Sequence, residues 1–392
     1  GSVMHQPAIT GAGVFTPEQV ITNDDLVAAF NAYADRQNAR HADAIAAGAR
    51  AAIPHSSAAF IEQASGIERR HVLDRSGVLD PEVMHPILRP RADDEPSAMA
   101  EMALPAIEAA LAEAGVAAGA VDAVLCAASN HERPYPAIAI EIQDLLGIGQ
   151  ETGGGFGFDM NVACSSATFG IQAAADMIRA GSIRRALVVN PEICSAHLEW
   201  RDRDCHFIFG DVCTAVLLER AEDARGDHFA IRSTRLATAF SNNIRNNNGF
   251  LRRTRPGQME DRRDMQFMQE GRRVFKEVLP MVSAHILRHM GEEGVQAGDL
   301  KRLWLHQANK TMNDFVGRKV LGRTPAPEEQ PNILQDYANT SSAGSIIAFA
   351  RHRGGFAPGE IGLICSFGAG YSVGSVILER RAAAETTAPD AA

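Results

Sequence analysis

The chain has 392 residues, of which 45% are hydrophobic and 22% charged, the composition of a globular protein rather than a disordered or fibrous one. Lys and Arg number 38 against 48 Asp and Glu, giving a net charge of −10, and no basic block is long enough to follow duplex phosphates. The longest apolar runs, about five residues, fall far short of the roughly twenty that cross a bilayer. We therefore expect no nucleic-acid partner, no membrane span and, without a secretory signal, a cytoplasmic location.

Two segments near the N-terminus interrupt a regular alternation of short apolar strands and amphipathic helices. Residues 40–59 are rich in alanine and predict a helical insertion, whereas residues 74–97 are rich in proline and charge. We expect both insertions to lie over the surface or over a pocket. The alternation itself predicts an α/β fold whose sheets are covered by helices on both faces.

The chain also contains segments that recur in the same order. The pairs are 121–130 with 300–309, Ser165-Ser166-Ala167 with Ser341-Ser342-Ala343, and 216–220 with 376–380. Such repetition predicts two pseudo-symmetric halves, residues 4–226 and 227–382. In this alignment Thr340 corresponds to Cys164, and His306 corresponds to Ala127.

Cys164 is the candidate nucleophile among six cysteines whose default interpretation is reduced core residues. An apolar strand precedes it and a helix follows, so the thiol lies at a helix N-terminus, where unpaired N–H groups favour the thiolate. If the halves pack about a pseudo-twofold axis, Cys164, His306 and Asn339 come together. The alternatives are a buried structural cysteine, a structural histidine and a helix-capping asparagine.

An arginine-rich segment, residues 241–273, stands out in the second half. Between Arg245 and Arg273 it holds eight arginines against four acidic residues, a local excess of +4 in an acidic protein. This excess predicts either an anionic partner or a solvated loop, and the solvated loop is the commoner of the two.

Around the candidate nucleophile the chain resembles the β-ketoacyl-acyl carrier protein synthase III (KAS III) family of thiolase-fold condensing enzymes. The resemblance covers nearly the whole chain and implies a thiolase-like fold with α-β-α-β-α layers. The matching motifs are Ala-Cys-Ser-Ser-Ala around Cys164, His306-Gln-Ala-Asn309, Tyr337-Ala-Asn339-Thr-Ser and Phe367-Gly-Ala-Gly370.

The resemblance implies a decarboxylative condensation of an acyl-CoA with malonyl-acyl carrier protein in fatty acid or related biosynthesis. Cys164 would carry the acyl group. The main-chain N–H groups of Cys164 and Ala369 would form the oxyanion hole, and His306 and Asn339 would stabilise the enolate left by CO₂. The family implies a homodimer and needs no metal or organic cofactor, and the insertions resemble a longer subgroup that accepts medium-chain acyl-CoA.

The resemblance also implies binding residues. Arg203 matches an arginine at the CoA adenine, and Tyr135 matches an aromatic that lines the acyl pocket across the dimer. The tryptophan that stacks on the adenine has no counterpart near residues 31–40. The candidate substrate-binding residues are Tyr135, Arg203, Phe209 and Asn309, and the candidate carrier-protein residues are Lys310, Arg318 and Lys319.

Three other interpretations compete with the synthase. A thiolase uses a second cysteine as a base, and Cys365 is the candidate, but a one-residue shift along a strand points it to the opposite face. A non-catalytic ketosynthase-like subunit would lack the nucleophile. A zinc site from Cys194, His197, Cys205 and His206 is disfavoured, because neighbouring strand residues point apart. Another acyl-CoA condensing enzyme of secondary metabolism remains an alternative.

Overall fold

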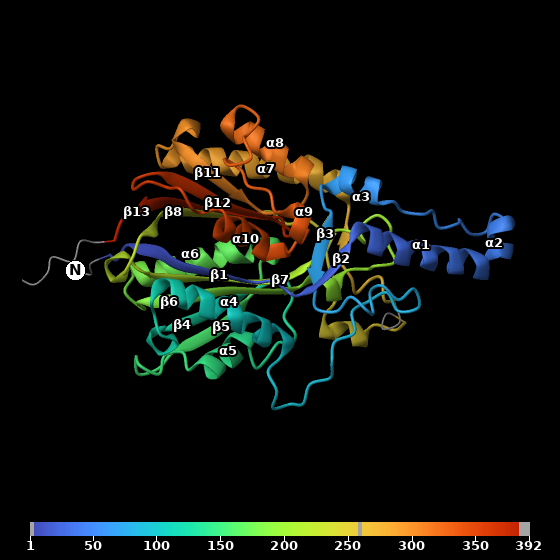
Figure 1. Cartoon of the computed structure of the whole chain (residues 1–392), viewed down its shortest axis with the longest axis horizontal. Helices are drawn as coiled ribbons and strands as arrows, with labels where there is room; N and C mark the ends of the chain where they lie inside the picture. The colour runs from blue at the N-terminus through green and yellow to red at the C-terminus, as the bar shows by residue number, and fades with distance from the viewer. Residues whose placement is uncertain (1–3, 258–260, 384–392) are drawn as a thin grey trace, which may run out of the picture.

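The computed structural model describes residues 4–257 and 261–383, which form one nine-stranded sheet with helices packed on it (Figure 1). The strand order is β11-β12-β13-β8-β1-β7-β6-β4-β5. The strands are β1 (Pro7–Phe15), β4 (Ala123–Ala127), β5 (Phe156–Met160), β6 (Arg185–Ile193), β7 (Asp211–Arg220), β8 (His228–Thr238), β11 (Leu300–Leu305), β12 (Ile361–Gly368) and β13 (Ser372–Arg381).

Strand pairing repeats across the middle of this sheet. β4 and β6 are parallel, and β6, β7 and β1 follow as antiparallel neighbours. β11 and β12 are likewise parallel, and β12, β13 and β8 follow as antiparallel neighbours. The two sets join where β1 pairs with β8. We propose from this repetition the division into halves at residues 226 and 227.

The helices form three layers around the two parts of the sheet. α4 (Ala98–Ala114) and α5 (Ile138–Leu146) cover β4, β6 and β7, and α7 (Gly271–Glu292) and α8 (Lys310–Leu321) cover β11–β13. α6 (Ser166–Arg179) and α10 (Gly344–Arg351) are buried between the two parts. The predicted α-β-α-β-α arrangement of a thiolase-like α/β fold is therefore confirmed.

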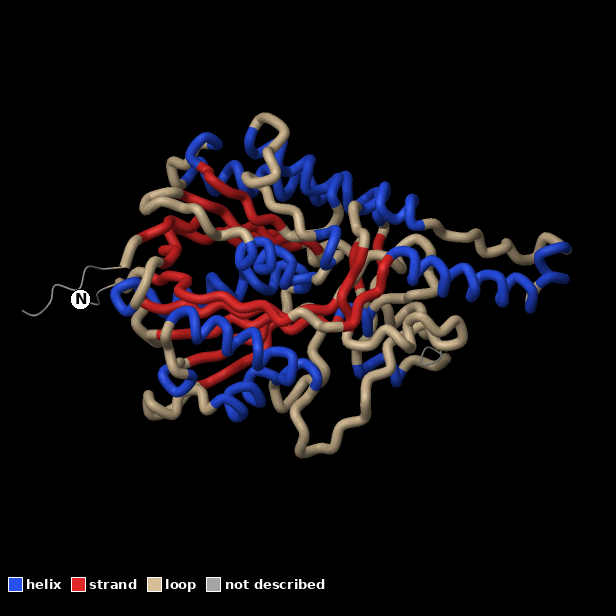
Figure 2. The backbone as a smooth tube through the Cα atoms, viewed as in Figure 1, coloured by secondary structure: helices blue, strands red, loops and turns tan. Residues whose placement is uncertain are grey.

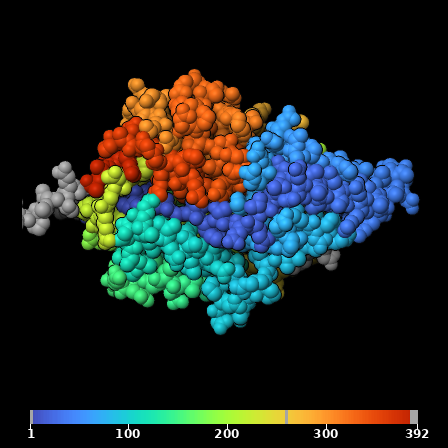
Figure 3. Space-filling model, in the orientation of Figure 1, coloured from blue at the N-terminus to red at the C-terminus, as the bar shows by residue number. Residues whose placement is uncertain are grey.

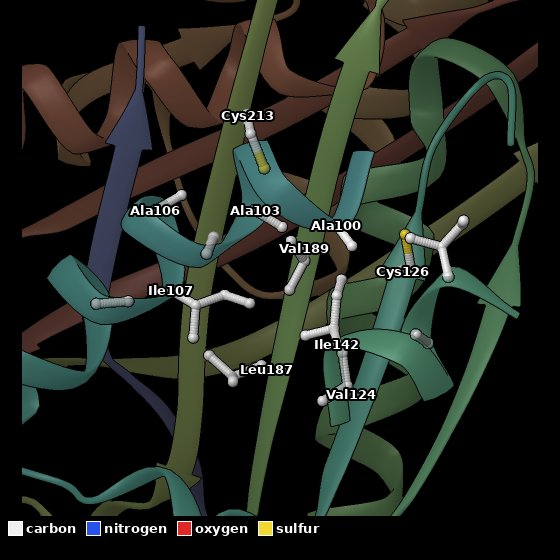
Figure 4. Close-up of a cluster of buried hydrophobic side chains, with 14 of the residues drawn as sticks. Ala100, Ala103, Ala106, Ile107, Val124, Cys126, Ile142, Leu187, Val189 and Cys213 are labelled. Carbon is white, nitrogen blue, oxygen red and sulfur yellow. The ribbon is translucent and has the colours of Figure 1, made fainter. Parts of the chain in front are cut away.

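Small residues allow these layers to approach closely. In Figure 4, Ala103, Ala106 and Ile107 of α4 lie against Leu187 and Val189 of β6. α4 is delimited by local signals, because the Ser97 hydroxyl accepts a hydrogen bond from the N–H of Ala100 and Gly115 ends the helix in a left-handed conformation. Such packing fixes the strand ends, where the candidate site lies.

The alanine-rich insertion forms part of an arm that extends from the body (Figures 2 and 3). Its outgoing helix α1 (Asn23–Arg40) ends before the predicted segment, and only α2 (Ala42–Ala46) and the start of α3 (Ala58–Ser65) are helical within 40–59. Residues 47–57 return without regular structure, held by two side chains of α1. Asn38 bonds both main-chain groups of Ile53, and Asn31 bonds those of Ser56. The helical propensity of this segment is therefore realised only in part.

The proline-rich insertion, residues 74–97, contains neither a strand nor a helix and ends at Ser97, which caps α4. The Asp74 carboxylate organises it by accepting hydrogen bonds from the N–H groups of Gly77 and Ile87. Val78 and Met84 are buried in the cluster that also holds Cys205 and Phe209.

The remaining elements are short. Two two-stranded sheets pair β2 (Gln19–Thr22) with β3 (Arg69–Val72), and β9 (Ile244–Arg245) with β10 (Met268–Gln269). Short helices are α9 (Leu334–Tyr337), η1 (Ala118–Ala120), η2 (Ala163–Ser165), η3 (Cys194–His197), η4 (Ala221–Asp223), η5 (Phe250–Thr254), η6 (Ala297–Asp299) and η7 (Ser341–Ala343). Among the described residues, no helix combines the length and apolar character that a membrane crossing requires.

Candidate active site

Two turns of the same shape meet at the centre of the molecule. η2 leads into α6, and η7 leads into α10. Ala163 and Ser341, the first residues of these turns, have left-handed φ values of 47° and 55°, a strained conformation for residues other than glycine that is frequent at functional sites. An asparagine two residues earlier supports each turn. The Oδ1 atom of Asn161 accepts from the N–H of Ala163 at 2.9 Å, and that of Asn339 accepts from Ser341 at 2.8 Å.

This correspondence corrects the repeat alignment by two residues. Because Ala163 matches Ser341, the counterpart of Cys164 is Ser342 rather than Thr340, and Asn339 corresponds to Asn161. The identical Ser-Ser-Ala letters suggested the wrong offset, because their backbone positions in the two turns differ.

Cys164 lies on a cavity of about 120 Å³. Burial raises the pKa of its thiol above the usual value, and hydrogen bonds from the Ser341 hydroxyl and the Ala369 N–H oppose that rise. The Ser341 Oγ atom lies 3.6 Å from Sγ. Burial therefore outweighs the thiolate-stabilising effect that we expected of a helix N-terminus.

Ser341 connects the three predicted catalytic residues. Its hydroxyl contacts Cys164, its N–H binds Asn339, and its main chain accepts a hydrogen bond from the buried ring of His306. Burial lowers the pKa of His306 to about 4, so the ring is neutral near pH 7. The structure thus brings Cys164, His306 and Asn339 together from η2, the end of β11 and the turn before η7.

Ala369 occupies the turn between β12 and β13. Its N–H donates to Cys164, and its carbonyl, in the next peptide unit, accepts a hydrogen bond from the Ser372 hydroxyl at 2.7 Å, which anchors the turn. The preceding Gly368 approaches Cys164 so closely that a Cβ atom there would lie 2.9 Å from Sγ. The two main-chain donors predicted for an oxyanion hole, at Cys164 and Ala369, therefore flank the sulfur.

The cavity wall includes part of the arginine-rich segment. Phe209 stacks edge-on against Phe267 with ring centroids 4.7 Å apart, and its backbone bridges Asn339. Residues 244–246 and Phe267 were not among the predicted site residues, because they lie in a segment without a repeat. The cavity residues are Ser129, Asn130, Ala163, Cys164, Cys194, His197, Phe209, Ile244, Arg245, Asn246, Phe267, Ser341 and Ala369.

Several arginines of this segment form contacts within the chain. Arg252 pairs with Asp264, Arg263 pairs with Asp202, and Arg262 donates to main-chain carbonyls of the proline-rich insertion. The local positive charge is therefore partly neutralised inside the molecule, and neither a free anion site nor a purely solvated loop describes it.

Comparisons with known proteins agree with this geometry. Sequence profiles of 3-oxoacyl-[acyl-carrier-protein] synthase III and of its C-terminal domain match residues 158–237 and 290–380. A β-ketodecanoyl-[acyl-carrier-protein] synthase of Pseudomonas aeruginosa is 54% identical over 352 residues, 90% of this chain and 99% of that protein. The chain belongs to the 3-oxoacyl-[acyl-carrier-protein] synthase III family. It is an acyltransferase that carries out acyl-carrier-protein-dependent 3-oxoacyl condensation in fatty acid synthesis.

More distant relatives share the same architecture. A β-ketoacyl-[acyl-carrier-protein] synthase III of Acidiphilium cryptum is 29% identical over 96% of this chain and 99% of that protein. The crystal structure of 3-oxoacyl-(acyl carrier protein) synthase III from Pseudomonas aeruginosa matches with a TM-score of 0.73 and 26% identity, over 97% of this chain and 99% of that one. The fold prediction is therefore confirmed both by the sequence relatives and by the solved structure.

The predicted substrate-binding residues of this synthase lie in different places. Arg203 is outside the cavity, where its guanidinium lies 4.6 Å from the ring centroid of Phe60 and donates to the carbonyl of His55. The resemblance places the aromatic residue that stacks on adenine near residues 31–40, whereas the aromatic beside Arg203 in the structure is Phe60. Tyr135 is 83% exposed and does not reach the Cys164 cavity of its own chain. Asn309 caps α8 by accepting from the N–H of Met312.

The three basic residues predicted to meet the carrier protein are exposed on α8. Lys310 lies 3.6 Å from Asp314, and Lys319 lies 5.6 Å from the ring centroid of Phe315. Arg318 borders a groove together with Lys310. All three are accessible to a partner on this helix.

The alternative cysteine sites are not assembled in this synthase. Cys365 is buried on the α7–α8 side of β12, away from the Cys164 cavity. Of the predicted zinc set, Cys194 donates to Glu192, whereas His206 packs on Phe30. The grouping that the described residues do offer is Cys126, His131 and Asp159, but both Asp159 oxygens already accept from main-chain N–H groups.

Proposed function

We propose that this synthase condenses an acyl-CoA primer with malonyl-acyl carrier protein through an acyl-Cys164 intermediate. The observation that carries the proposal is the meeting of Cys164, His306 and Asn339 around Ser341 at a cavity. Cys164 takes the acyl group from CoA, and the N–H groups of Cys164 and Ala369 stabilise the oxyanion. Removing one such donor typically costs about 3–4 kcal/mol of barrier.

The second half-reaction uses two polar side chains of the second half of the chain, His306 after β11 and Asn339 before η7. After malonyl-acyl carrier protein binds, the Nε2–H of His306 turns from the main chain of Ser341 to the thioester oxygen, to which the Asn339 amide also donates while CO₂ leaves. A neutral His306 suits this role, because it donates a proton in a hydrogen bond without titrating near pH 7. The resulting carbanion attacks the acyl-Cys164 carbonyl and frees the thiol. The proposed steps use protein groups alone and require no cofactor or metal.

The primer that we propose is an eight-carbon acyl-CoA. The relative with 54% identity is named for a ten-carbon β-ketodecanoyl product, and decarboxylative condensation adds two of those carbons from malonate. The apolar cavity wall formed by Phe209, Ile244 and Phe267 is consistent with a medium-length alkyl chain. This proposal narrows the medium-chain prediction made from the insertions.

Two surfaces are proposed to hold the carriers. The Arg203 guanidinium lies over the Phe60 ring outside the cavity, and an adenine ring of CoA would stack on the outer face of this pair. Lys310, Arg318 and Lys319 offer positive charge to an acidic carrier protein.

A homodimer is proposed through the free edge of the sheet. β5 is the terminal strand and carries the exposed Phe156 and Phe158, whose rings stack in parallel. Edge strands with exposed apolar residues favour pairing with a second copy. In such a dimer Tyr135 would be available to the partner's site. The cytoplasmic location stays a prediction.

Intact-mass spectrometry tests the proposal directly. We expect incubation with acyl-CoAs from acetyl to dodecanoyl to add one acyl group to the wild-type protein, fastest with octanoyl-CoA, and none to Cys164→Ser. Cys365→Ser is the matched control, and it should acylate normally. Acylation that persists in Cys164→Ser, or that disappears in Cys365→Ser, would contradict the assignment.

A further inference from the structure

A buried carboxylate lies beside the nucleophile and has no role in the steps above. Glu192, near the end of β6, is 1% exposed. Ser129 donates to it twice, from its N–H at 2.6 Å and from its hydroxyl at 2.5 Å. Cys194 donates from 3.8 Å, and the hydroxyls of Ser341 and Ser342 lie close enough to lower its pKa. None of these described partners is a cation, which is unusual for a buried charge.

Ser341 links this carboxylate to the reactive thiol. Its Oγ atom contacts Sγ of Cys164 at 3.6 Å and lies close enough to Glu192 to lower the pKa of that carboxyl. A hydroxyl has a single proton to donate and can accept from another donor. The Ser341 proton can therefore be donated to Cys164 or to Glu192, and donation to Glu192 leaves Oγ free to accept from the thiol.

We propose that Glu192 accepts the proton of the Cys164 thiol through the Ser341 hydroxyl when Cys164 attacks the acyl-CoA. The proposal rests on the proposed function, because it assumes that Cys164 is the nucleophile. Glu192 is a positioning residue in this scheme, since it acts on the sulfur only through Ser341.

The proton transfers balance over the acyl-transfer half-reaction. The thiol proton moves to Ser341 Oγ while the Ser341 hydroxyl proton moves to the Glu192 carboxylate, so negative charge passes from carboxylate to sulfur. The sulfur forms a bond to the thioester carbon, and collapse of the tetrahedral intermediate breaks the bond to the CoA sulfur. The departing sulfur takes a proton back from Ser341, which recovers one from Glu192.

The environment of Glu192 suits a proton acceptor that works near neutral pH. Burial raises its pKa to about 7, while the Ser129, Ser341 and Ser342 hydrogen bonds oppose the rise. The titratable groups that face it are thiols of four elements, all with pKa values raised by burial. They are Cys126 of β4, Cys164 of η2, Cys194 of η3 and Cys213 of β7.

His306 is a poorer candidate for this proton. Its Nδ1 atom has no partner, and its other nitrogen is engaged with the main chain of Ser341 rather than with the thiol. Its pKa of about 4 also makes it a weaker base than Glu192.

Single-turnover acylation by octanoyl-CoA between pH 5.5 and 8.5 tests the relay in the full-length protein. In the wild type we expect the rate to fall as the pH drops through about 7, because a protonated Glu192 can no longer accept. Glu192→Gln should lose this dependence and acylate about 10- to 100-fold more slowly at pH 8, at the lower end of general-base effects. Glu192→Asp, which restores an acid, should recover part of the acylation rate and part of its pH dependence.

Two serines supply a matched pair. Ser341→Ala breaks the relay and should slow acylation as much as Glu192→Gln, with no further loss in the double variant. Ser342→Ala removes a hydroxyl that lowers the pKa of Glu192 but does not contact Cys164, since its proton is donated to the carbonyl of Ala127. It should keep the plateau rate and shift the pH dependence upward.

The outcomes separate the relay from the proposed function. If the wild type fails to acylate on Cys164, the proposed function is wrong. If the wild type acylates but Glu192→Gln keeps its rate or its pH dependence, the relay is wrong. Equal slowing at all pH values in Glu192→Gln, together with a normal Ser341→Ala, would show that Glu192 only holds the turns in place. Should Glu192→Gln not fold, the serine pair decides alone.

Discussion

The turn before α6 carries Cys164, whereas the turn of the same shape before α10 carries Ser342 at the corresponding position. Their surroundings correspond too. Glu192 pairs with Val212 and Gly368 pairs with Ser372 at equivalent positions of the two antiparallel strand pairs, so Glu192 and Gly368 are counterparts. Cys164 faces Gly368, and Ser342 lies beside Glu192. In the first half the residue facing Cys164 is a glycine, which has no side chain to occupy the space beside the sulfur. At the equivalent place in the second half, the Glu192 side chain lies beside Ser342.

Under the proposed function, this difference would divide the two half-reactions between the two halves of the chain. The first turn leaves room above Cys164 for an acyl group. The second half supplies His306 after β11 and Asn339 before η7, which correspond to Ala127 and Asn161 in the first half. Variants should therefore separate the two half-reactions according to the half in which they lie.

The largest effect is expected from the second turn. His306→Ala or Asn339→Ala should lower the rate of CO₂ release from malonyl-acyl carrier protein by about 100- to 1,000-fold, because each removes a donor to the developing enolate. Formation of acyl-Cys164, followed by intact mass, should stay within a few-fold of wild type. Asn161→Ala is the matched control in the first turn and should slow acylation while leaving decarboxylation intact. Loss of acylation in His306→Ala would contradict this division.

The pH dependence of stability should show opposite signs for the two buried groups. Burial lowers the pKa of His306 from 6.5 to about 4, so the unfolded chain binds more protons between these values and stability falls as the pH drops through this window. Burial raises the pKa of Glu192 from 4.5 to about 7, so the folded chain binds more protons and stability falls as the pH rises. Each window corresponds to roughly 3 kcal/mol.

Urea denaturation at pH 4.5 and 7.5 measures both effects. His306→Gln should lose less stability on acidification than the wild type does, whereas Glu192→Gln should lose less on the shift to pH 7.5. Comparing the two pH values within each variant removes the cost of the substitution itself. If both substitutions changed the stability difference between pH 4.5 and pH 7.5 in the same direction, burial would not set these two pKa values.

The sequence predicted the parts of this comparison that are local. Cys164, His306 and Asn339 lie in short motifs, and alternating strands and helices identified the layered fold. The linking residues were missed, because Ser341 and Glu192 acquire their importance only when η7 packs on the end of β6. Phe60 and Phe267 come from segments without repeats, so only the tertiary structure shows that they lie beside Arg203 and Phe209. The repeat offset was wrong by two because letters matched where backbone conformation did not.

Filling the open side of Cys164 should disturb its reaction. In Gly368→Ala the new Cβ atom would lie 2.6 Å from Cβ and 2.9 Å from Sγ of Cys164, closer than such atoms can approach. The sulfur must move, and a displacement of about 1 Å costs on the order of 100-fold in rate. We expect that loss in acylation by octanoyl-CoA. Gly354→Ala, where a Cβ atom meets nothing within 4 Å, is the control for the substitution itself. Normal acylation in Gly368→Ala would show that the sulfur tolerates the shift.

The smallest effect is expected at the entrance, where only the first half-reaction should respond. Phe60→Leu or Arg203→Ala should raise the KM for octanoyl-CoA about 10-fold with little change in kcat, since base stacking on such groups is worth about 1–3 kcal/mol. The matched substrate is the octanoyl thioester of N-acetylcysteamine, which lacks the nucleotide and should react equally with wild type and variants. Decarboxylation of malonyl-acyl carrier protein should also be unchanged. A rise in KM for the truncated thioester would mean that these residues shape the acyl cavity rather than bind the adenine.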